Sequence, residues 1–338
     1  MRLHLFLPAL LLACCLTGLQ AQPSPATPPQ PQPQPALRVP HAAQAAVLGA
    51  ARAGQRIVTV GDHGVVMLSD DGGRQWRQAR EVPVRSLLAA VSFADERHGW
   101  AVGHQGVVIA TADGGETWAL QRNDTAVDRP LFSVHAFSAQ HLVAVGLWSL
   151  VLRSSDGGAS WQTAQLPPPP AAAGRPPRKA DLNLFHLFTD ERGRLYAAAE
   201  RGHLLRSEDQ GASWTYLVTG YAGSFWTGLA PAPGVLLAAG LRGSMYRSTD
   251  DGATWARIDT GRTASITALL AEPGRPGVAG RITALGLDGL LLHSTDQGAS
   301  FSGSPRPDRA ALTTGLAVPG GAPLLFSRQG AVAPEAAR

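Results

Sequence analysis

Short apolar runs separated by polar turns recur along the chain from about residue 40 onward. In the clearest case, residues 91–93, 100–102 and 107–109 are β-prone runs, and a fourth run begins at Trp118. The runs are apolar at consecutive positions, which is typical of strands that are buried on both faces. Four such strands in about 43 residues, repeated along the chain, predict the blade of a β-propeller.

One motif occurs six times within this pattern and reads Ser/Thr-x-Asp-x-Gly-x-(Ser/Thr/Gln)-aromatic. Successive aspartates are separated by 42, 43, 53, 41 and 46 residues. An aspartate in a turn can accept nearby backbone N–H groups, so we interpret these carboxylates as structural. The aromatic residues that end the motif are interpreted as packing residues. The two sets are Asp71, Asp113, Asp156, Asp209, Asp250 and Asp296, and Trp76, Trp118, Trp161, Trp214, Trp255 and Phe301.

Two small residues precede each motif, ten and seven positions before its aspartate. In the first copy they are Gly61 and Gly64. Because glycine readily adopts a positive φ, this pair predicts a tight turn between the second and third strands of a blade. The tip of that turn, eight positions before the aspartate, is occupied in successive copies by His63, Gln105, Trp148, Arg201, Arg242 and Asp288.

The length of the repeat region predicts the number of blades. Residues 36–338 number 303, which is enough for seven blades of about 43 residues. Six blades carry the motif, and residues 311–318, 323–327 and 330–333 can form a seventh that lacks a fourth strand. We therefore predict an all-β propeller of seven four-stranded blades, with six as the alternative. An N-terminal strand just before the first inner strand (about residues 42–51) is predicted to pair into the last blade and close the ring.

Composition and charge exclude several other classes of protein. The chain contains 38 glycines and 26 prolines, far more than a coiled coil or helical bundle would have. Its 44% of apolar residues excludes a disordered chain. A net charge of +4 over 338 residues does not indicate nucleic-acid binding, and no nucleic-acid partner is predicted.

The beginning of the chain is predicted to direct export. Arg2 precedes an apolar run over residues 3–19, which is typical of a signal peptide spanning residues 1–21. The alternative is a lipoprotein signal, which would leave a lipid anchor on Cys14. Residues 22–35 alternate proline with glutamine and other residues, and they predict a semi-rigid linker before the propeller domain at 36–338. We therefore predict a periplasmic protein, either soluble or tethered to a membrane.

The repeated motif is the Asp-box, or BNR repeat, of sialidases and other propellers. Here it follows a Val-Gly-x-x-Gly turn, as at residues 102–108. This combination resembles the photosystem II stability/assembly factor family of exported seven-bladed propellers, over about residues 40–330. The resemblance implies chaperone-like binding of membrane-complex subunits rather than catalysis. Nothing in the sequence indicates a photosynthetic host.

The positions that residues occupy within each repeat predict a binding face. Because strands alternate in direction, the tips and the blade-to-blade connections share one face, and the Asp-boxes lie on the other. Trp148 at a tip has little core to bury it, and arginines with exposed aromatics are typical of interaction hot spots. The alternative is a solvated loop surface on which Trp148 covers its own blade. The candidate binding residues are Trp148, Arg201, Arg242, Arg85, Arg129 and Trp226, with Arg175, Arg178 and Lys179 from the long connection at 165–181.

A second set of bases lies three residues before the aspartates of blades three to six, where Arg153, Arg206, Arg247 and His293 occupy neighbouring third strands. We favour ion pairs with carboxylates near the boxes over a cationic stripe for an acidic partner.

Catalytic chemistry is not indicated by the remaining residues. The element Arg38-Val39-Pro40 is similar to one that precedes the first blade of sialidases, but the tyrosine, acidic base and arginine cluster of those enzymes have no assignable counterparts. The histidines show no metal-ligand spacing, and no catalytic residue, metal or cofactor is predicted. We favour a non-enzymatic, monomeric scaffold that binds a protein subunit of a membrane or envelope complex. The alternatives are a sialidase-like glycoside hydrolase and a carbohydrate-binding propeller in which Trp148 and Trp226 stack on sugars.

Overall fold

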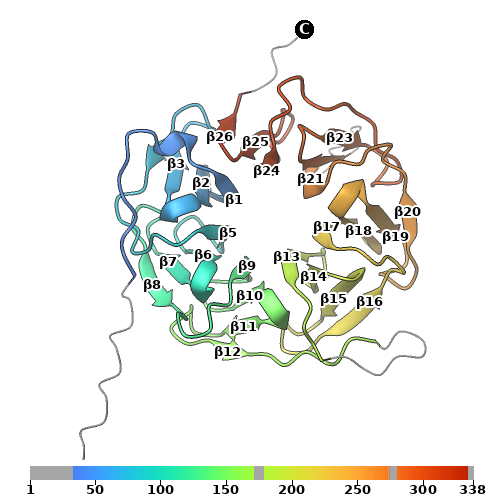
Figure 1. Ribbon diagram of the computed structural model, residues 1–338, viewed down its shortest axis with the longest axis horizontal. Helices are drawn as coiled ribbons and strands as arrows, with labels where there is room; N and C mark the ends of the chain where they lie inside the picture. The colour runs from blue at the N-terminus through green and yellow to red at the C-terminus, as the bar shows by residue number, and fades with distance from the viewer. Residues whose placement is uncertain (1–32, 171–178, 273, 275–279, 334–338) are drawn as a thin grey trace, which may run out of the picture. The chain divides into compact units, whose positions relative to one another are not determined.

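Seven antiparallel sheets are arranged in a ring, and the first strand of each sheet lies nearest the centre (Figure 1). The computed structural model describes residues 33–170, 179–272, 274 and 280–333. The prediction of an all-β, seven-bladed propeller is confirmed. Helices in the described ranges are 3₁₀ turns of three residues, and none has the length and hydrophobicity needed to cross a membrane.

The first five blades each have four strands, and the last two have three. In the sixth blade an isolated bridge between His293 and Ser302 takes the fourth position. The first three blades consist of β1 (Val47–Ala53), β2 (Arg56–Gly61), β3 (Val66–Ser69) and β4 (Arg77–Gln78); β5 (Leu88–Phe93), β6 (Gly99–Gly103), β7 (Val108–Thr111) and β8 (Ala119–Arg122); and β9 (Leu131–Ala136), β10 (Leu142–Gly146), β11 (Val151–Ser154) and β12 (Gln162–Thr163).

The remaining blades continue in the same order around the ring (Figure 1). They consist of β13 (Leu184–Thr189), β14 (Leu195–Ala199), β15 (His203–Ser207) and β16 (Thr215–Val218); β17 (Phe225–Ala232), β18 (Val235–Gly240), β19 (Met245–Ser248) and β20 (Ala256–Ile258); β21 (Ile266–Glu272), β22 (Arg281–Gly286) and β23 (Leu291–Ser294); and β24 (Leu312–Leu316), β25 (Leu324–Ser327) and β26 (Gly330–Val332). The 3₁₀ turns are η1 (Ala42–Gln44), η2 (Asp62–Gly64), η3 (His104–Gly106), η4 (Leu147–Ser149) and η5 (Leu241–Gly243).

The predicted closure by an N-terminal strand in the last blade is wrong. The N–H of Ala36 donates to the carbonyl of Val82 at 3.0 Å, and the side chain of Gln78 hydrogen-bonds the backbone of residues 37 and 39. This segment therefore lies along the first blade, beside β4 and the residues that follow it. The last sheet contains only β24, β25 and β26 among the described residues.

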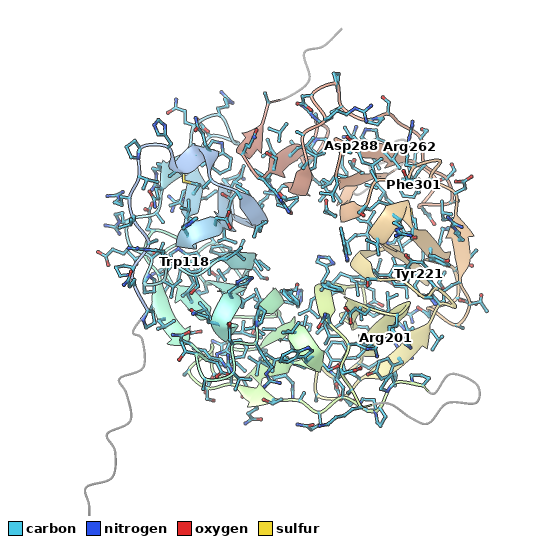
Figure 2. All side chains as sticks on the ribbon, viewed as in Figure 1. Trp118, Arg201, Tyr221, Arg262, Asp288 and Phe301 are labelled. Carbon is cyan, nitrogen blue, oxygen red and sulfur yellow. The ribbon has the colours of Figure 1, made fainter. Side chains whose placement is uncertain are left out.

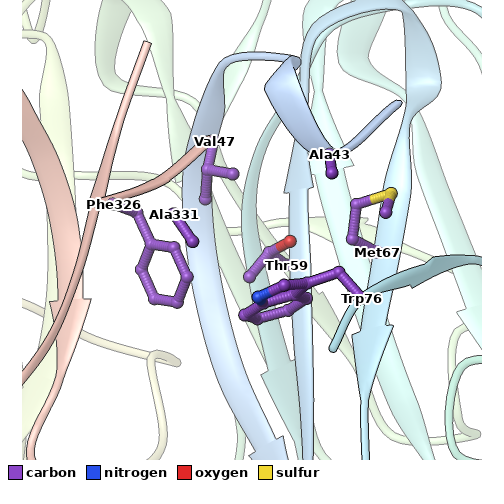
Figure 3. Close-up of a pocket in the computed structure, with 7 residues that line it drawn as sticks. All are labelled: Ala43, Val47, Thr59, Met67, Trp76, Phe326 and Ala331. Carbon is purple, nitrogen blue, oxygen red and sulfur yellow. The ribbon is translucent and has the colours of Figure 1, made fainter. Parts of the chain in front are cut away.

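Packing of the first blade on the last closes the ring instead. The indole of Trp76, in the first Asp-box, lies edge-on to the ring of Phe326 with 5.8 Å between centroids (Figure 3). The hydroxyl of Thr313 donates to the carbonyl of Val47 across the same boundary. The Asp-boxes of other blades pack on the preceding blade in the same way, as Gly115 does on Leu68. Closure therefore repeats an existing contact and needs no exchanged strand.

A β-bulge interrupts the pairing near the start of every inner strand. In β9, Leu131 pairs with Gly146 and Ser133 with Val145, so Phe132 has no partner. The first small residue of each repeat lies opposite this bulge, and a Cβ at Gly103, for example, would overlap the carbonyl oxygen of Leu87. The backbones of the first and second strands approach closely here, and this explains why the repeat has a small residue at this position. The seven unpaired bulge residues are Leu48, Ala89, Phe132, Phe185, Trp226, Thr267 and Thr313.

Each Asp-box turn is closed by its own side chains. In the third blade, the Ser154 hydroxyl donates to Asp156 Oδ1 at 2.8 Å. The N–H and the hydroxyl of Ser160 donate to the two Asp156 oxygens at 2.9 and 2.6 Å. The same bonds form at Asp113, Asp209, Asp250 and Asp296, whereas at Asp71 the equivalent residue is Gln75, which donates only its N–H. The carboxylates thus bind within their own turns.

We expect the propeller to lose stability as the pH falls from about 4 to about 2. Hydrogen bonds from Ser160 and Ser154 lower the pKa of Asp156 to about 2, and those from Thr254 and Ser248 do the same for Asp250. A carboxyl whose pKa is lower in the folded state stabilises the fold above its ordinary value of 3.8. That stabilisation is lost as the pH falls through the folded-state value. Thermal unfolding midpoints across this range measure the effect.

The variant Asp250→Asn isolates the contribution of one box, because asparagine does not titrate. Its thermal midpoint should lie below that of the wild type at neutral pH, and the difference should shrink toward about pH 2. A difference that stayed constant over the whole range would contradict the assignment.

Candidate binding face

The turns between the second and third strands of the six motif-bearing blades lie on the same face as the connections between blades. We call it the tip-turn face; two of its tip residues, Arg201 and Asp288, are labelled in different blades in Figure 2. The turns bond directly to those connections, as when the N–H of Arg242 donates to Ser265 Oγ at 3.0 Å. All six tip residues have left-handed backbones, with φ between 52° and 58°. The tips are therefore rigid loops held by the next blade.

Trp148 is the exposed aromatic residue of this face. Its side chain is 57% exposed, and both Trp148 and Ser149 have positive φ, which is uncommon outside glycine. The next blade holds this strained turn: the Trp148 N–H donates to Asn183 Oδ1 at 3.1 Å, and the Ser149 N–H donates to the carbonyl of Leu182 at 2.7 Å. The Asn183 amide in turn donates to Glu200 at 2.9 Å. Strain that is retained in this way is often found at functional sites.

The predicted basic residues of the tip-turn face come from several blades. Arg201 forms an ion pair with Asp181 at 2.8 Å, and the two side chains are 39% and 46% exposed. Both terminal guanidinium nitrogens donate to this carboxylate, at 2.8 and 3.3 Å, so the pair is bidentate. Arg85 and Arg242 are exposed, and Arg129 is half-buried with a buried Nε that has no hydrogen-bond partner in the described part of the chain.

The other predicted binding residues fall in different places. Lys179 is exposed on the connection that enters the fourth blade. Arg175 and Arg178 lie outside the described residues. Trp226 is not on the tip-turn surface but lines a cavity at the centre of the ring.

The bases three residues before the aspartates join neighbouring blades. Nε of Arg153 and of Arg247 donates at 3.1 Å to the carbonyl of the residue that follows the aspartate in the next blade's box, Gln210 or Gln297. Arg206 donates to the equivalent carbonyl at 3.5 Å and also forms an ion pair with Glu208 at 3.4 Å. The predicted ion pair with a carboxylate near a box is therefore found only for Arg206 among the described residues. For Arg153 and Arg247, the next blade's box turn supplies a backbone carbonyl as the hydrogen-bond acceptor.

A central cavity of about 350 Å³ is lined by the inner strands of all seven blades. No Asp, Glu, Lys, Arg or Tyr is among the described residues that line it. Its aromatic residues include Phe132 and Phe185, whose rings stack 5.7 Å apart. The sequence analysis missed both, although spacing contains the signal: in four blades the bulge residue lies fourteen positions before the first small residue of the repeat.

The arrangement of tyrosines does not favour a hydrolase. Tyr196 Oη donates to Asp190 at 3.2 Å beside Arg194, which superficially matches the chemistry of a sialidase. Its side chain is 0% exposed, however, and burial together with Asp190 raises the pKa of its hydroxyl well above the ordinary value of 10.0. A substrate therefore has no access to this tyrosine.

These features define the chain as a BNR-repeat propeller with an exposed aromatic and basic face. A family model described as "Photosynthesis system II assembly factor YCF48" matches residues 75–255, more than half of the sequence. The chain belongs to this family.

Comparison with curated proteins finds no match. Among solved structures, one described as "YCF48 bound to D1 peptide" is 18% identical with a TM-score of 0.68, covering 88% of this chain and 97% of that one. YCF48 from Cyanidioschyzon merolae is 16% identical with a TM-score of 0.68, covering 87% and 95%. An ancestral GH74 enzyme is 16% identical with a TM-score of 0.58, covering 74% of this chain and 36% of that one. At such identities the likeness concerns the fold.

Proposed function

We propose that this chain is an exported, non-enzymatic propeller that binds a protein subunit of a membrane or envelope complex, as an assembly factor does. Membership of the family supports this function, as does the D1 peptide bound to one structural relative. The observation that carries the proposal is the strained, 57% exposed Trp148 on a turn that the next blade holds.

The mechanism of binding is rigid display. Burying an exposed tryptophan at an interface removes a large apolar surface from water, and truncating such an anchor typically costs 2 kcal/mol or more. Because its turn is already ordered, Trp148 loses little conformational entropy on binding. Arg201 and Arg242 occupy the same position in the next two blades, where they can pair with carboxylates of the partner.

The triple variant Trp148→Ala, Arg201→Ala, Arg242→Ala should bind the partner at least about 30-fold more weakly than the wild type. Crosslinking and affinity capture from the native envelope, followed by mass spectrometry, identify the bound protein and measure its loss. We expect the wild type to retain a subunit of a membrane or envelope complex.

The matched control is His63→Ala, Gln105→Ala, Asp288→Ala, which changes the same left-handed tip in the other three motif-bearing blades. The control should keep the captured subunit, and circular dichroism melting curves should show that both variants fold. Equal capture by the wild type and the first variant would place the binding surface elsewhere.

Export is also part of the proposal, although the leader and Cys14 lie outside the described residues. A signal peptide cut near residue 21 would release a monomeric periplasmic protein, whereas a lipid on Cys14 would tether it to a membrane. The mass of the mature N-terminal peptide distinguishes the two forms.

A further inference from the structure

The connection from the third blade to the fourth is longer than the path between two blades requires. It runs over residues 164–183, between β12 and β13. The connections after β4, β8, β16 and β20 have only nine, eight, six and seven residues. Long surface connections in a compact domain often carry a function of their own. The described beginning of this connection contains four consecutive prolines, at residues 167–170.

These prolines impose one backbone conformation. The ring of proline fixes φ at about −65°, and a residue that precedes proline is disfavoured in the helical region. Leu166 and the first three prolines each precede a proline, and no described peptide bond is cis. The run is therefore a left-handed polyproline II helix, which repeats after about three residues. We call residues 166–170 the polyproline run.

Burial along the polyproline run repeats with the same period. Leu166 packs against the core between the third and fourth blades, and Pro169, three residues later, is buried. Pro167, Pro168 and Pro170 are exposed. One of the three faces of the helix therefore lies against the propeller, and the other two face solvent.

The fourth blade holds the polyproline run in place. The hydroxyl of Tyr216, in β16, donates to the carbonyl of Pro167 at 3.1 Å. Burial raises the pKa of Tyr216 to about 12, so the hydroxyl is protonated and can donate at neutral pH. Figure 1 shows the chain passing from β12 along the rim of the ring toward β16. The run is thus ordered on the rim before any partner binds.

The exposed part of the run offers proline rings and carbonyl oxygens but no backbone donors. Within the described ranges, no hydrogen bond reaches the carbonyl of Pro168, Pro169 or Pro170. Residues 164–170 include no Asp, Glu, Lys or Arg. Such a surface suits aromatic side chains, which pack on the rings while Trp N–H or Tyr O–H groups donate to the carbonyls.

We propose that the polyproline run is a docking site for a partner domain that has an aromatic-lined, polyproline-binding groove. The rings of Pro167, Pro168 and Pro170 enter that groove. Because the backbone conformation is set before binding, little conformational entropy is lost. This site goes beyond the proposed function, since it involves none of the tip residues.

A photo-crosslinking residue beside the run tests the site in the native envelope. The full chain with p-benzoylphenylalanine in place of the exposed Gln165 should form an adduct with an envelope protein. Two synthetic peptides then compete for that protein: Ac-Gln-Leu-Pro-Pro-Pro-Pro-Ala-NH2, and the same peptide with alanine in place of its first, second and fourth prolines. We expect the first peptide to abolish the adduct at a concentration at which the second leaves it unchanged.

The triple variant Pro167→Ala, Pro168→Ala, Pro170→Ala should bind the purified crosslinked protein at least about tenfold more weakly than the wild type. Titrating the first peptide into that protein should change its tryptophan or tyrosine fluorescence, because the peptide itself has no aromatic residue. Pro307→Ala is the matched control, since Pro307 is exposed in a turn outside any proline run. It should bind as the wild type does, and circular dichroism melting curves should show that both variants fold.

Several results would overturn the proposal. They are the absence of any adduct, equal effects of the two peptides on it, equal binding by the triple proline variant and the control, and unchanged fluorescence on peptide binding. The Trp148/Arg201/Arg242 triple variant separates this inference from the proposed function, because it should keep the adduct at position 165. If it lost the adduct while the triple proline variant kept full binding, the tip-turn face would bind that protein and the run would not.

Discussion

Replacing Trp214 with alanine should lower the free energy of unfolding by about 3–5 kcal/mol. The indole is 4% exposed and packs with Val143, Val145 and Leu187 at the boundary between the third and fourth blades. Its N–H donates to the carbonyl of Gly211 at 3.0 Å, which closes the Asp-box turn. Truncation therefore leaves a cavity and an unclosed turn at the same boundary. Equilibrium unfolding in urea, followed by circular dichroism, measures the loss.

Trp161→Ala is the matched control, since Trp161 holds the same box position one blade earlier. Its side chain is less buried, and its buried indole N–H has no hydrogen-bond partner among the described residues. The equivalent acceptor in its own box, the carbonyl of Gly158, receives no hydrogen bond from this indole. We expect this variant to lose only about 1–2 kcal/mol, because it removes an unsatisfied polar group together with the apolar contact. Equal losses at the two positions would show that box tryptophans contribute alike regardless of burial.

Replacing Arg194 with leucine should cost about 3 kcal/mol of unfolding free energy. Its guanidinium bridges Asp190 at 2.6 Å in the fourth blade and Asp251 at 2.5 Å in the fifth. The side chain of Asp190 is only 3% exposed, so losing the arginine leaves a buried carboxylate without its cation. Urea unfolding at neutral pH again provides the measurement.

Two further variants identify the cause of that loss. Arg192→Leu removes a cation that is 59% exposed and 3.8 Å from Asp251, and it should change stability by no more than about 0.5 kcal/mol. Adding Asp190→Asn to Arg194→Leu removes the orphaned charge and should recover part of the stability. Failure of the double variant to recover any stability would mean that lost packing, rather than the uncompensated charge, causes the effect.

The positions of the tip residues and of the Asp-boxes follow directly from the sequence repeat. This is why the binding face could be predicted. Each tip residue lies eight positions before a box aspartate, and in all six blades it adopts the same left-handed backbone. A residue type that is unusual at such a position, as Trp148 is, can therefore be recognised from the sequence. That Asn183 and Glu200 hold its turn could not be recognised, because they belong to the next blade and match no motif.

Phe132 and Phe185, which line the central cavity, escaped the sequence analysis for a related reason. A bulge reverses the expected direction of one side chain, and its position depends on the backbone pairing rather than on a residue type. Phe132 and Phe185 look like ordinary core residues within apolar runs. The structure shows that they face the central cavity, whereas Phe225, next to Trp226, is fully buried in its blade.

The sequence by itself determined the all-β class, the seven blades, the Asp-box turns and the tip residues, because each depends on local turn chemistry repeated at a near-constant interval. Only the tertiary structure decided how the ring closes and which side chains face its centre. The hydroxyl of Thr313 and the carbonyl of Val47 are 266 residues apart in sequence, and no local pattern indicates that they meet. Arg153 and Arg247 likewise bond to carbonyls of the next blade. Such contacts arise only when separately formed blades pack around one axis.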